Sequence, residues 1–302
     1  MSRHETALSL IGGTPLVRIN RARNPEMATL WAKIEGANPT HAGRDRLAKH
    51  LVDVALETAA VRPGQGLLIE ATAGRTGLSL AMVCAIRGVR LVLVMPRNTP
   101  GDWRHRLSMT GAECVLTDPG EGMLGAHREA RRLADEMEQA VFLDMFNNPD
   151  NPAAYPHSLA AELIADFADR ALDGLVVGVG TGGTITGIAA PLRARWPGIQ
   201  IWAVEPASSA VLSGGTAGPH SIPGIGAGFV PSILDRGAYD RVEPVSDQHA
   251  HDAMRALARA EGLLVDVASG ACFIAARKLA AELGPSCDVV FLCPSTPLGP
   301  LD

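Results

Sequence analysis

A glycine-rich segment, residues 178–184, has the residue types needed to bind a phosphate group. It follows an apolar, β-branched run at residues 175–179, which predicts a buried strand, and it precedes an apolar segment at residues 185–192, which predicts a helix. Backbone N–H groups converge where such a strand passes through glycines into a helix, and the helix dipole adds positive potential. An ordinary tight turn has the same composition, so the glycines alone leave both interpretations open. The predicted cradle consists of Gly180, Thr181, Gly182, Gly183 and Thr184.

Composition limits the class of protein. The 302 residues are 47% hydrophobic, which is enough for a large core and predicts two lobes. The net charge of -5 argues against nucleic acid or an anionic membrane surface as a partner. We find no apolar run of transmembrane length and no signal-peptide core near the first residue, so we expect a cytoplasmic protein. Five cysteines without CxxC spacing are typical of reduced, buried thiols.

Predicted strands and helices alternate along the chain, which favours an α/β fold with a mostly parallel sheet flanked by helices in each lobe. Ligands of such sheets bind at the carboxyl ends of the strands. A Pro/Asn-rich loop at residues 147–156 is the expected lobe boundary. The larger lobe would contain residues 1–37 plus 148–302 and carry the glycine loop, and the smaller would contain residues 38–147. Predicted strands span residues 30–34, 67–71, 89–95, 113–117, 141–143, 175–179, 199–204, 239–245, 263–267 and 288–293.

Nine motifs follow one another in an order that resembles a known enzyme family. They lie at residues 11–16, 33–39, 45–46, 72–77, 147–152, 178–184, 204–206, 218–220 and 224–229. With them the chain resembles the cysteine synthase (O-acetylserine sulfhydrylase) family from about residue 8 to about residue 294. The resemblance implies the tryptophan-synthase-β-like fold of type II pyridoxal phosphate (PLP) enzymes.

The resemblance also implies roles for particular segments. In that family the glycine loop holds the cofactor phosphate, and a lysine before an Asp-Arg pair forms the Schiff base. A Thr-Ser-Gly-Asn-Thr-Gly loop binds the substrate carboxylate with help from a Gln, and a Ser faces the pyridine nitrogen. The positions implied to bind substrate here are Thr72, Ala73, Gly74, Arg75, Thr76, His41, Arg44 and Met145.

The Schiff-base position departs from the family pattern. Residues 38–46 read Asn-Pro-Thr-His-Ala-Gly-Arg-Asp-Arg, which places Arg44 where the lysine belongs. A lysine amine can lose its proton and attack an aldehyde, whereas a guanidinium with a pKa above ~12 stays charged and non-nucleophilic. Lys49 lies five residues further on, ~140° around a helix that turns ~100° per residue, and Lys33 and Lys278 are also poor substitutes. We therefore expect no covalently bound cofactor.

Further family positions have changed as well. Arg75 replaces the Asn that would contact the PLP ring oxygen, and Met145 replaces the carboxylate-binding Gln. Ala268, with Ser269 beside it, occupies the position of the pyridine partner, and His41 replaces a small residue of the lysine motif. Two arginines near a phosphate loop predict a site for a small anion, either PLP held without a covalent bond or another phosphate-bearing ligand.

Three hypotheses about function stay open on the sequence. The first is a pseudoenzyme that has lost Schiff-base catalysis and binds an anion or a partner protein. The second is an enzyme with altered chemistry in a specialised pathway. The third is a PLP-dependent cysteine synthase that makes cysteine from O-acetylserine or O-phosphoserine and a sulfur donor.

Partner expectations follow from the same resemblance. We expect a homodimer, and the segment 72–77 suggests the tail of a serine acetyltransferase or another pathway enzyme as a protein ligand. We expect neither nucleic acid nor membrane as a partner. A metal site is not expected either, because His249 and His251 are two residues apart at a predicted helix start, so their rings diverge.

Overall fold

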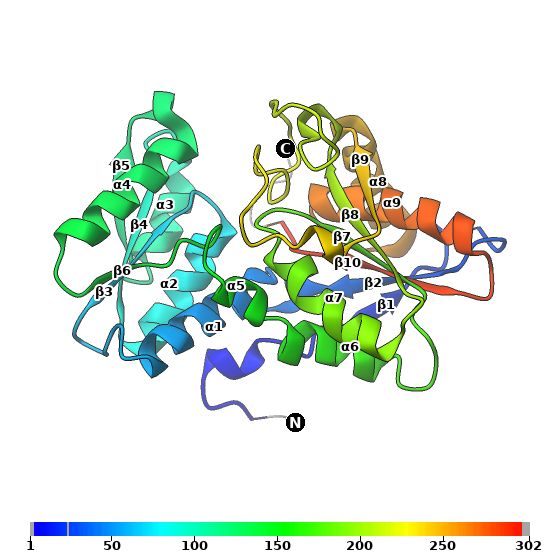
Figure 1. Ribbon diagram of the computed structural model, residues 1–302, viewed down its shortest axis with the longest axis horizontal. Coiled ribbons are helices and arrows are strands. Elements are labelled where there is room, and N and C mark those ends of the chain that lie inside the picture. The colour runs from blue at the N-terminus through cyan, green and yellow to red at the C-terminus, as the bar shows by residue number, and fades with distance from the viewer. Residues whose placement is uncertain (1–2, 23, 298–302) are drawn as a thin grey trace. The chain divides into compact units, whose positions relative to one another are not determined.

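The computed structural model describes residues 3–22 and 24–297 (Figure 1). By their internal contacts the residues form two compact units. Unit 1 consists of Met1–Ile11 and Arg44–Asn151, and unit 2 consists of Gly12–Gly43 and Pro152–Asp302. The lobes expected from the sequence, residues 1–37 plus 148–302 and residues 38–147, stay a prediction.

Unit 1 is built on a parallel sheet with the strand order β5-β4-β3-β6. All five residues of β3 are buried, as are six of the seven in β4, which agrees with sequences that are apolar except for Glu70 and Arg90. Helix α4 packs against this sheet through Ala126 and Ala130. The elements of the unit are η1 (Ala7–Leu10), α1 (Arg44–Glu57), β3 (Leu67–Ala71), α2 (Arg75–Arg87), β4 (Arg90–Pro96), α3 (Gly101–Ser108), β5 (Glu113–Thr117), η3 (Pro119–Glu121), α4 (Gly122–Glu136) and β6 (Ala140–Phe142); α5 (Asp150–Ala153) crosses into unit 2.

Unit 2 contains a sheet with the strand order β1-β2-β10-β7-β8-β9. Its strand pairs are parallel except for β1 with β2, where Leu16 pairs with Lys33. The strands are β1 (Leu16–Arg18), β2 (Thr29–Ile34), β7 (Gly174–Gly178), β8 (Gln200–Pro206), β9 (Arg241–Val245) and β10 (Asp288–Cys293). The helices are η2 (Glu35–Ala37), a π-helical turn η4 (Pro156–Ala160), α6 (Ala161–Asp166), α7 (Gly183–Arg195), η5 (Ala207–Ser209), η6 (Arg236–Ala238), α8 (Asp247–Glu261) and α9 (Val267–Leu283).

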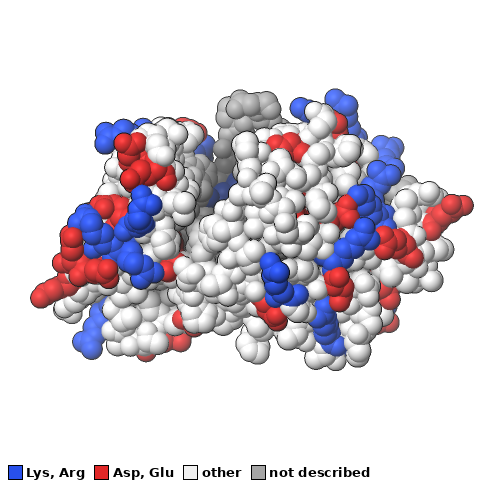
Figure 2. All heavy atoms as spheres, turned by 45° about the horizontal axis from the view of Figure 1, so that its top comes forward, with Lys and Arg blue, Asp and Glu red and all other residues white. Residues whose placement is uncertain are grey.

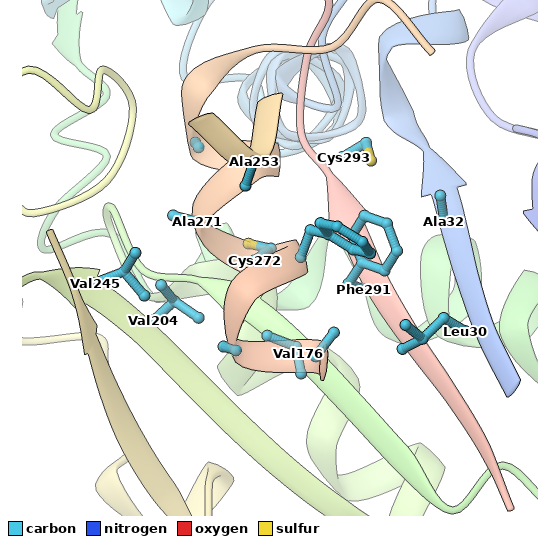
Figure 3. Packing of buried hydrophobic residues seen from close by; sticks show 14 of the residues in the cluster. Leu30, Ala32, Val176, Val204, Val245, Ala253, Ala271, Cys272, Phe291 and Cys293 are labelled. Atoms are coloured by element: carbon cyan, nitrogen blue, oxygen red, sulfur yellow. The ribbon is translucent and has the colours of Figure 1, made fainter. Parts of the chain in front are cut away.

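Helix α9 is the centre of the unit 2 core. Ten of its residues are buried, and Figure 3 shows Ala271 and Cys272 facing Val176 of β7, Val204 of β8 and Phe291 of β10. Burial of such a helix on a parallel sheet is the main stabilising interaction of this fold class. The predicted α/β class with mostly parallel sheets is thereby confirmed.

One predicted strand is wrong. Residues 263–267 form no ladder in the described part of the chain. Gly262, at a φ of 70°, ends α8 in the left-handed conformation, and Asp266 caps α9 by accepting a hydrogen bond from the Ser269 amide at 2.8 Å. Leu264 is 64% exposed. The apolar run is a short connection between two helices, which periodicity cannot distinguish from a strand.

The surface agrees with a modest net charge. On the face in Figure 2, positive and negative side chains are interspersed. On α4, for example, Arg128 pairs with Glu121 at 3.1 Å and Arg132 with Glu129 at 2.7 Å. In residues 3–22 and 24–297, no helix combines the length and the apolar character needed to cross a membrane.

Substitution Gly270→Ala is expected to destabilise the protein because α8 and α9 cross at this glycine. A Cβ atom there would lie 2.1 Å from the Ala250 carbonyl oxygen and 2.8 Å from the Met254 nitrogen. Overpacking of this kind costs about 1–3 kcal/mol or more, which thermal denaturation would detect as a lower Tm. Gly198→Ala is the matched control, since nothing lies within 4 Å of its added methyl group. Equal Tm values for the two variants would contradict the close helix contact.

Candidate functional site

The predicted phosphate loop lies between β7 and α7 of unit 2. Gly182 precedes the helix at a φ of 85°, and a Cβ atom there would lie 2.8 Å from Leu234. Both the backbone conformation and the close contact therefore require glycine. Gly182, the N-cap residue of the 13-residue helix α7, has no side chain to cap it, and the Gly183 amide makes a long hydrogen bond of 3.4 Å to the Thr181 hydroxyl. This geometry suits an anion at the helix N-terminus.

Segments 205–213 and 226–231 lie next to this glycine loop. The Gly226 amide donates to the Val179 carbonyl at 2.9 Å, and the buried Glu205 carboxylate accepts from the Leu212 and Ser213 amides at 2.7 and 2.9 Å. A small pocket forms between these segments. It is lined by Val179, Gly180, Glu205, Ser209, Val211, Leu212, Gly226, Ala227, Gly228, Phe229 and Pro231.

The two predicted pyridine-partner positions lie at the start of α9. Ala268 is fully buried and offers no polar side-chain atom. The Ser269 hydroxyl donates to the Asp266 carboxylate at 2.6 Å, and that carboxylate also accepts from Ser295. The hydroxyl is therefore part of the N-cap of α9, and its proton is used in the bond to Asp266.

All three lysines of the chain form ion pairs. Lys33 of β2 is 1% exposed and donates to Asp166 at 2.8 Å and to the Thr14 carbonyl at 2.8 Å, with Glu162 3.1 Å away. Lys49 pairs with Asp53 at 2.8 Å, and Lys278 pairs with Glu243. Each ammonium group is thus neutralised by a carboxylate. Lys33 in particular is surrounded by structural contacts of unit 2.

In unit 1, both arginines singled out from the sequence begin helices. Arg44 is the first residue of α1, and Arg75 is the first residue of α2. The two helices pack against each other. Helix α1 leads to the amino end of β3 and α2 leaves its carboxyl end, so both helices begin at the carboxyl edge of the sheet.

The segment 72–76 forms a tight turn between β3 and α2. The Gly74 amide donates to the Thr72 hydroxyl at 3.2 Å, and Gly74 is the N-cap residue of α2 without any side-chain cap. Thr72 and Thr76 are buried, whereas Ala73 and Arg75 are half-buried. The Gly77 amide donates to the Gly74 carbonyl at 3.0 Å, and the positive end of the helix dipole at this start suits an anion.

His41 belongs to unit 2 and lies in a turn beside the segment that follows β10. It is exposed at a φ of 59°, its amide donates to the Asn38 carbonyl at 2.8 Å, and its carbonyl accepts from Thr296 at 3.1 Å. Histidine, like asparagine and aspartate, adopts this left-handed conformation more often than most other residues.

The Met145 side chain has no group that could donate a hydrogen bond to a ligand. Its side chain is 7% exposed, its amide donates to the Glu70 carboxyl at 3.2 Å, and its carbonyl accepts from Asn151 at 2.6 Å. Met145 therefore differs in chemistry from the glutamine that the resemblance implies at this position. It lies on the loop that follows β6, the strand next to β3.

Two acidic residues of unit 1 were missed by the sequence analysis. Glu70, the fourth residue of β3, is 1% exposed, and burial raises its pKa to about 8, with a smaller rise from the Asp144 carboxylate. Its bonds from the Ala71 and Met145 amides oppose that rise. Asp144 adopts a φ of 49° and accepts from Arg131 at 2.6 Å. The ionisable Glu70 inside the otherwise apolar strand 67–71 was the sequence signal that could have indicated its role.

Metal binding finds no support in the described residues. No group of three or more His, Cys, Asp or Glu side chains in residues 3–22 and 24–297 has the arrangement to hold a metal ion. Burial also raises the pKa of the Cys84 and Cys272 thiols to about 12, so both stay protonated at neutral pH.

Comparison with known proteins extends these observations. A family model described as "Pyridoxal-phosphate dependent enzyme" matches residues 7–295. A cysteine synthase of Staphylococcus aureus (strain Mu50 / ATCC 700699) is 38% identical over 287 residues, which are 95% of this chain and 92% of the relative.

Solved structures give the same result. The cysteine synthase of Entamoeba histolytica superimposes with a TM-score of 0.92 at 34% identity, covering 98% of this chain and 88% of that one. An O-acetylserine-dependent cystathionine β-synthase from Helicobacter pylori gives a TM-score of 0.90 at 34% identity, covering 98% and 96%.

Substitution Glu70→Gln is expected to remove a pH dependence of stability. With a folded-state pKa of about 8, Glu70 keeps its proton in the folded state while the unfolded chain ionises near its usual pKa of about 4.3. The free energy of unfolding therefore falls as pH rises from about 4.5 to about 8, by an amount on the order of 3–5 kcal/mol at most. Glutamine cannot ionise, so the variant lacks this decrease.

Urea denaturation at several pH values between about 5 and about 8 measures the effect. The stability of Glu70→Gln relative to the original protein should rise steadily with pH. A difference that stays constant over this range would show that Glu70 ionises normally in the folded state.

Proposed function

This chain belongs to the family of pyridoxal-phosphate-dependent enzymes, and we propose that it is a cysteine-synthase-like protein that binds a small anionic ligand without covalent attachment of PLP. The observation that carries the proposal is the state of its lysines. Lys33, Lys49 and Lys278 each form an ion pair, and the position implied for the Schiff-base lysine is Arg44. PLP supplies an electron sink for amino-acid chemistry when an enzyme holds it.

The phosphate group of PLP fits the residues present. Gly182 has the positive φ that the loop needs, and this N-cap residue of α7 has no side chain that would exclude an anion. Thr181 and Thr184 add hydroxyl groups beside the backbone N–H groups. These residues would hold PLP or another phosphate-bearing ligand through charge-assisted hydrogen bonds.

The remainder of the cofactor does not fit in the same way. A covalent bond to its aldehyde needs a neutral amine, and a guanidinium does not provide one. Ala268 has no polar side-chain atom, and the Ser269 hydroxyl donates to Asp266. These residues therefore do not support covalent attachment of PLP.

Arg44 and Arg75 indicate the charge of the ligand. A cation in the first turn of a helix is unfavourable by about 0.3–1 kcal/mol because it opposes the helix dipole. Both α1 and α2 begin with an arginine, and they begin at the same edge of the unit 1 sheet. An anion bound at this edge would offset that cost. We expect a carboxylate or phosphate group there, since guanidinium forms bidentate bonds to both.

A second candidate function is PLP-dependent cysteine synthesis from O-acetylserine or O-phosphoserine. The observation in its favour is the similarity to cysteine synthases, which extends over 95% of the chain at 38% identity. It requires that Lys33, Lys49 or Lys278 leaves its carboxylate partner and reaches the cofactor. An altered chemistry that uses His41 and the two arginines to polarise an anionic substrate is compatible with the main proposal.

The assembly expected from the resemblance also stays a prediction. It comprises a homodimer and the C-terminal tail of a serine acetyltransferase or another pathway enzyme as a protein ligand. A cytoplasmic location and the absence of nucleic-acid and membrane partners stay predictions in the same sense.

Substitution Arg44→Lys tests the main proposal directly. The purified protein is incubated with PLP, reduced with borohydride and analysed by peptide mass spectrometry and visible absorption. We expect no phosphopyridoxyl adduct on the original protein. We expect an adduct at position 44 in Arg44→Lys, because an amine then stands where the family has its lysine.

Arg62→Lys is the matched control, since it adds a lysine at an exposed position of the same unit. It should form no more adduct than the original protein. A stoichiometric adduct on Lys33, Lys49 or Lys278 of the original protein would refute the proposal and favour the second candidate.

An activity assay separates the two candidates independently. The protein is supplied with PLP, sulfide and either O-acetyl-L-serine or O-phospho-L-serine, and cysteine is quantified. We expect no cysteine above the rate without protein, because no lysine is available for the reaction. Turnover that depends on added PLP would establish the second candidate instead.

A further inference from the structure

The loops that follow β3 and β6 in unit 1 leave the sheet side by side. The two strands pair in parallel, with Leu67 opposite Ala140 and Ile69 opposite Phe142. The last ladder bond runs from the Leu143 amide to the Ile69 carbonyl at 2.9 Å. Beyond it, residues 72–76 lead into α2, and residues 144–149 turn away. Both loops therefore start at the carboxyl edge, where ligands of parallel sheets bind.

Glu70 connects these two loops where the backbone ladder ends. Its Oε1 accepts the Ala71 amide at 2.8 Å, and its Oε2 accepts the Met145 amide at 3.2 Å. The buried Glu70 side chain thus binds Ala71, just before the 72–76 turn, and Met145, at the start of the 144–149 loop. Hydrogen bonds to a buried carboxyl are costly to break, because the group is left unsatisfied.

Asp144 fixes the conformation of the second loop. It is 8% exposed and adopts a φ of 49°, which aspartate tolerates better than most residues. Arg131 donates to its Oδ2 at 2.6 Å, while the His127 ring lies 3.0 Å from its Oδ1 and the Asn147 side-chain Nδ2 donates to that oxygen at 2.9 Å. We call His127 and Arg131, both on α4, the α4 clasp.

The α4 clasp also contacts Phe142, the last residue of β6. The His127 ring packs edge-on against Phe142 with centroids 5.0 Å apart, and the Arg131 guanidinium lies 5.3 Å from the same ring centroid. His127 and Arg131 therefore contact both the end of β6, through Phe142, and the turn that follows it, through Asp144. A carboxylate bound by three donors in this way is more rigid than a single exposed ion pair.

We propose that Asp144 and Glu70 are positioning residues that couple the 144–149 loop to the 72–76 turn, so that the α4 clasp preorganises both ligand-facing segments of unit 1 together. The functional meaning of this coupling rests on the proposed function, which assigns a ligand to residues 72–76. The coupling itself does not require any ligand. Met145 transmits it through its backbone amide, and its buried side chain offers the ligand nothing polar.

Amide hydrogen exchange of the ligand-free protein tests the coupling. Arg131→Gln should accelerate exchange roughly fivefold or more in peptides that cover residues 144–149 and also in those that cover residues 72–77, since local opening reports local stability. Arg132→Gln is the matched control. It changes the neighbouring arginine on α4, which binds Glu129 and Glu136 and does not contact Asp144.

Exchange in the central strand β4 serves as the measure of global unfolding and should not change. If Arg131→Gln accelerates exchange only in residues 144–149, or in neither segment, the coupling is refuted. Equal acceleration by Arg132→Gln would refute it as well. The result is independent of the PLP experiment with Arg44→Lys, so failure of one does not imply failure of the other.

A double-mutant cycle identifies the route of the coupling. In a Glu70→Gln background, Arg131→Gln should still accelerate exchange in residues 144–149 but add nothing further in residues 72–77. Asp144→Asn, which keeps an oxygen acceptor and tolerates positive φ, should lie much closer to the original protein than Asp144→Ala. Additive effects in residues 72–77 would show that Glu70 does not transmit the coupling.

Discussion

Parallel strand pairing is the constraint on which the rest of the structure depends. Within each unit, every strand of the parallel ladder ends at one edge, so the loops that follow the strands collect there. In unit 2 this edge carries the glycine loop after β7 and the cap of α9. In unit 1 it carries the 72–76 turn, the 144–149 loop and the two helix starts with arginine. The chemistry of each unit is decided by which side chains the loops bring to that edge.

The difference between an amine and a guanidinium then determines what the protein can do. A lysine near an aldehyde cofactor alternates between charged and neutral forms, and the neutral form is the nucleophile. The lysines of this chain are instead paired with carboxylates, and Lys33 is held by Asp166, Glu162 and a carbonyl inside unit 2. Arginine retains its charge under any physiological condition. An arginine can therefore bind an anion but cannot form a Schiff base.

The sequence predicted the α/β class, most of the strands and the glycine loop between β7 and α7, whereas phosphate binding by that loop stays a prediction. These features depend on local patterns, such as the β-branched run of β7 followed by Gly180 and Gly182. It failed at residues 263–267, because an apolar helix connection and a short strand have the same composition. The role of Glu70 was also missed, since its bond from the Met145 amide joins residues that are 75 positions apart in the sequence. The assignment of individual ligand contacts stays a prediction.

The cap of α9 has a consequence for how relatives of this protein are classified from sequence. Ser269 stands beside Ala268, the position that family resemblance links to a cofactor nitrogen, and its amide and hydroxyl both bind Asp266. A residue with such a folding role persists under selection for stability alone, whatever happens to catalysis. Survival of a serine at this position is therefore poor evidence of activity in a diverged homologue. Annotation of such chains should weigh the reactive amine above the motifs that also serve as helix caps.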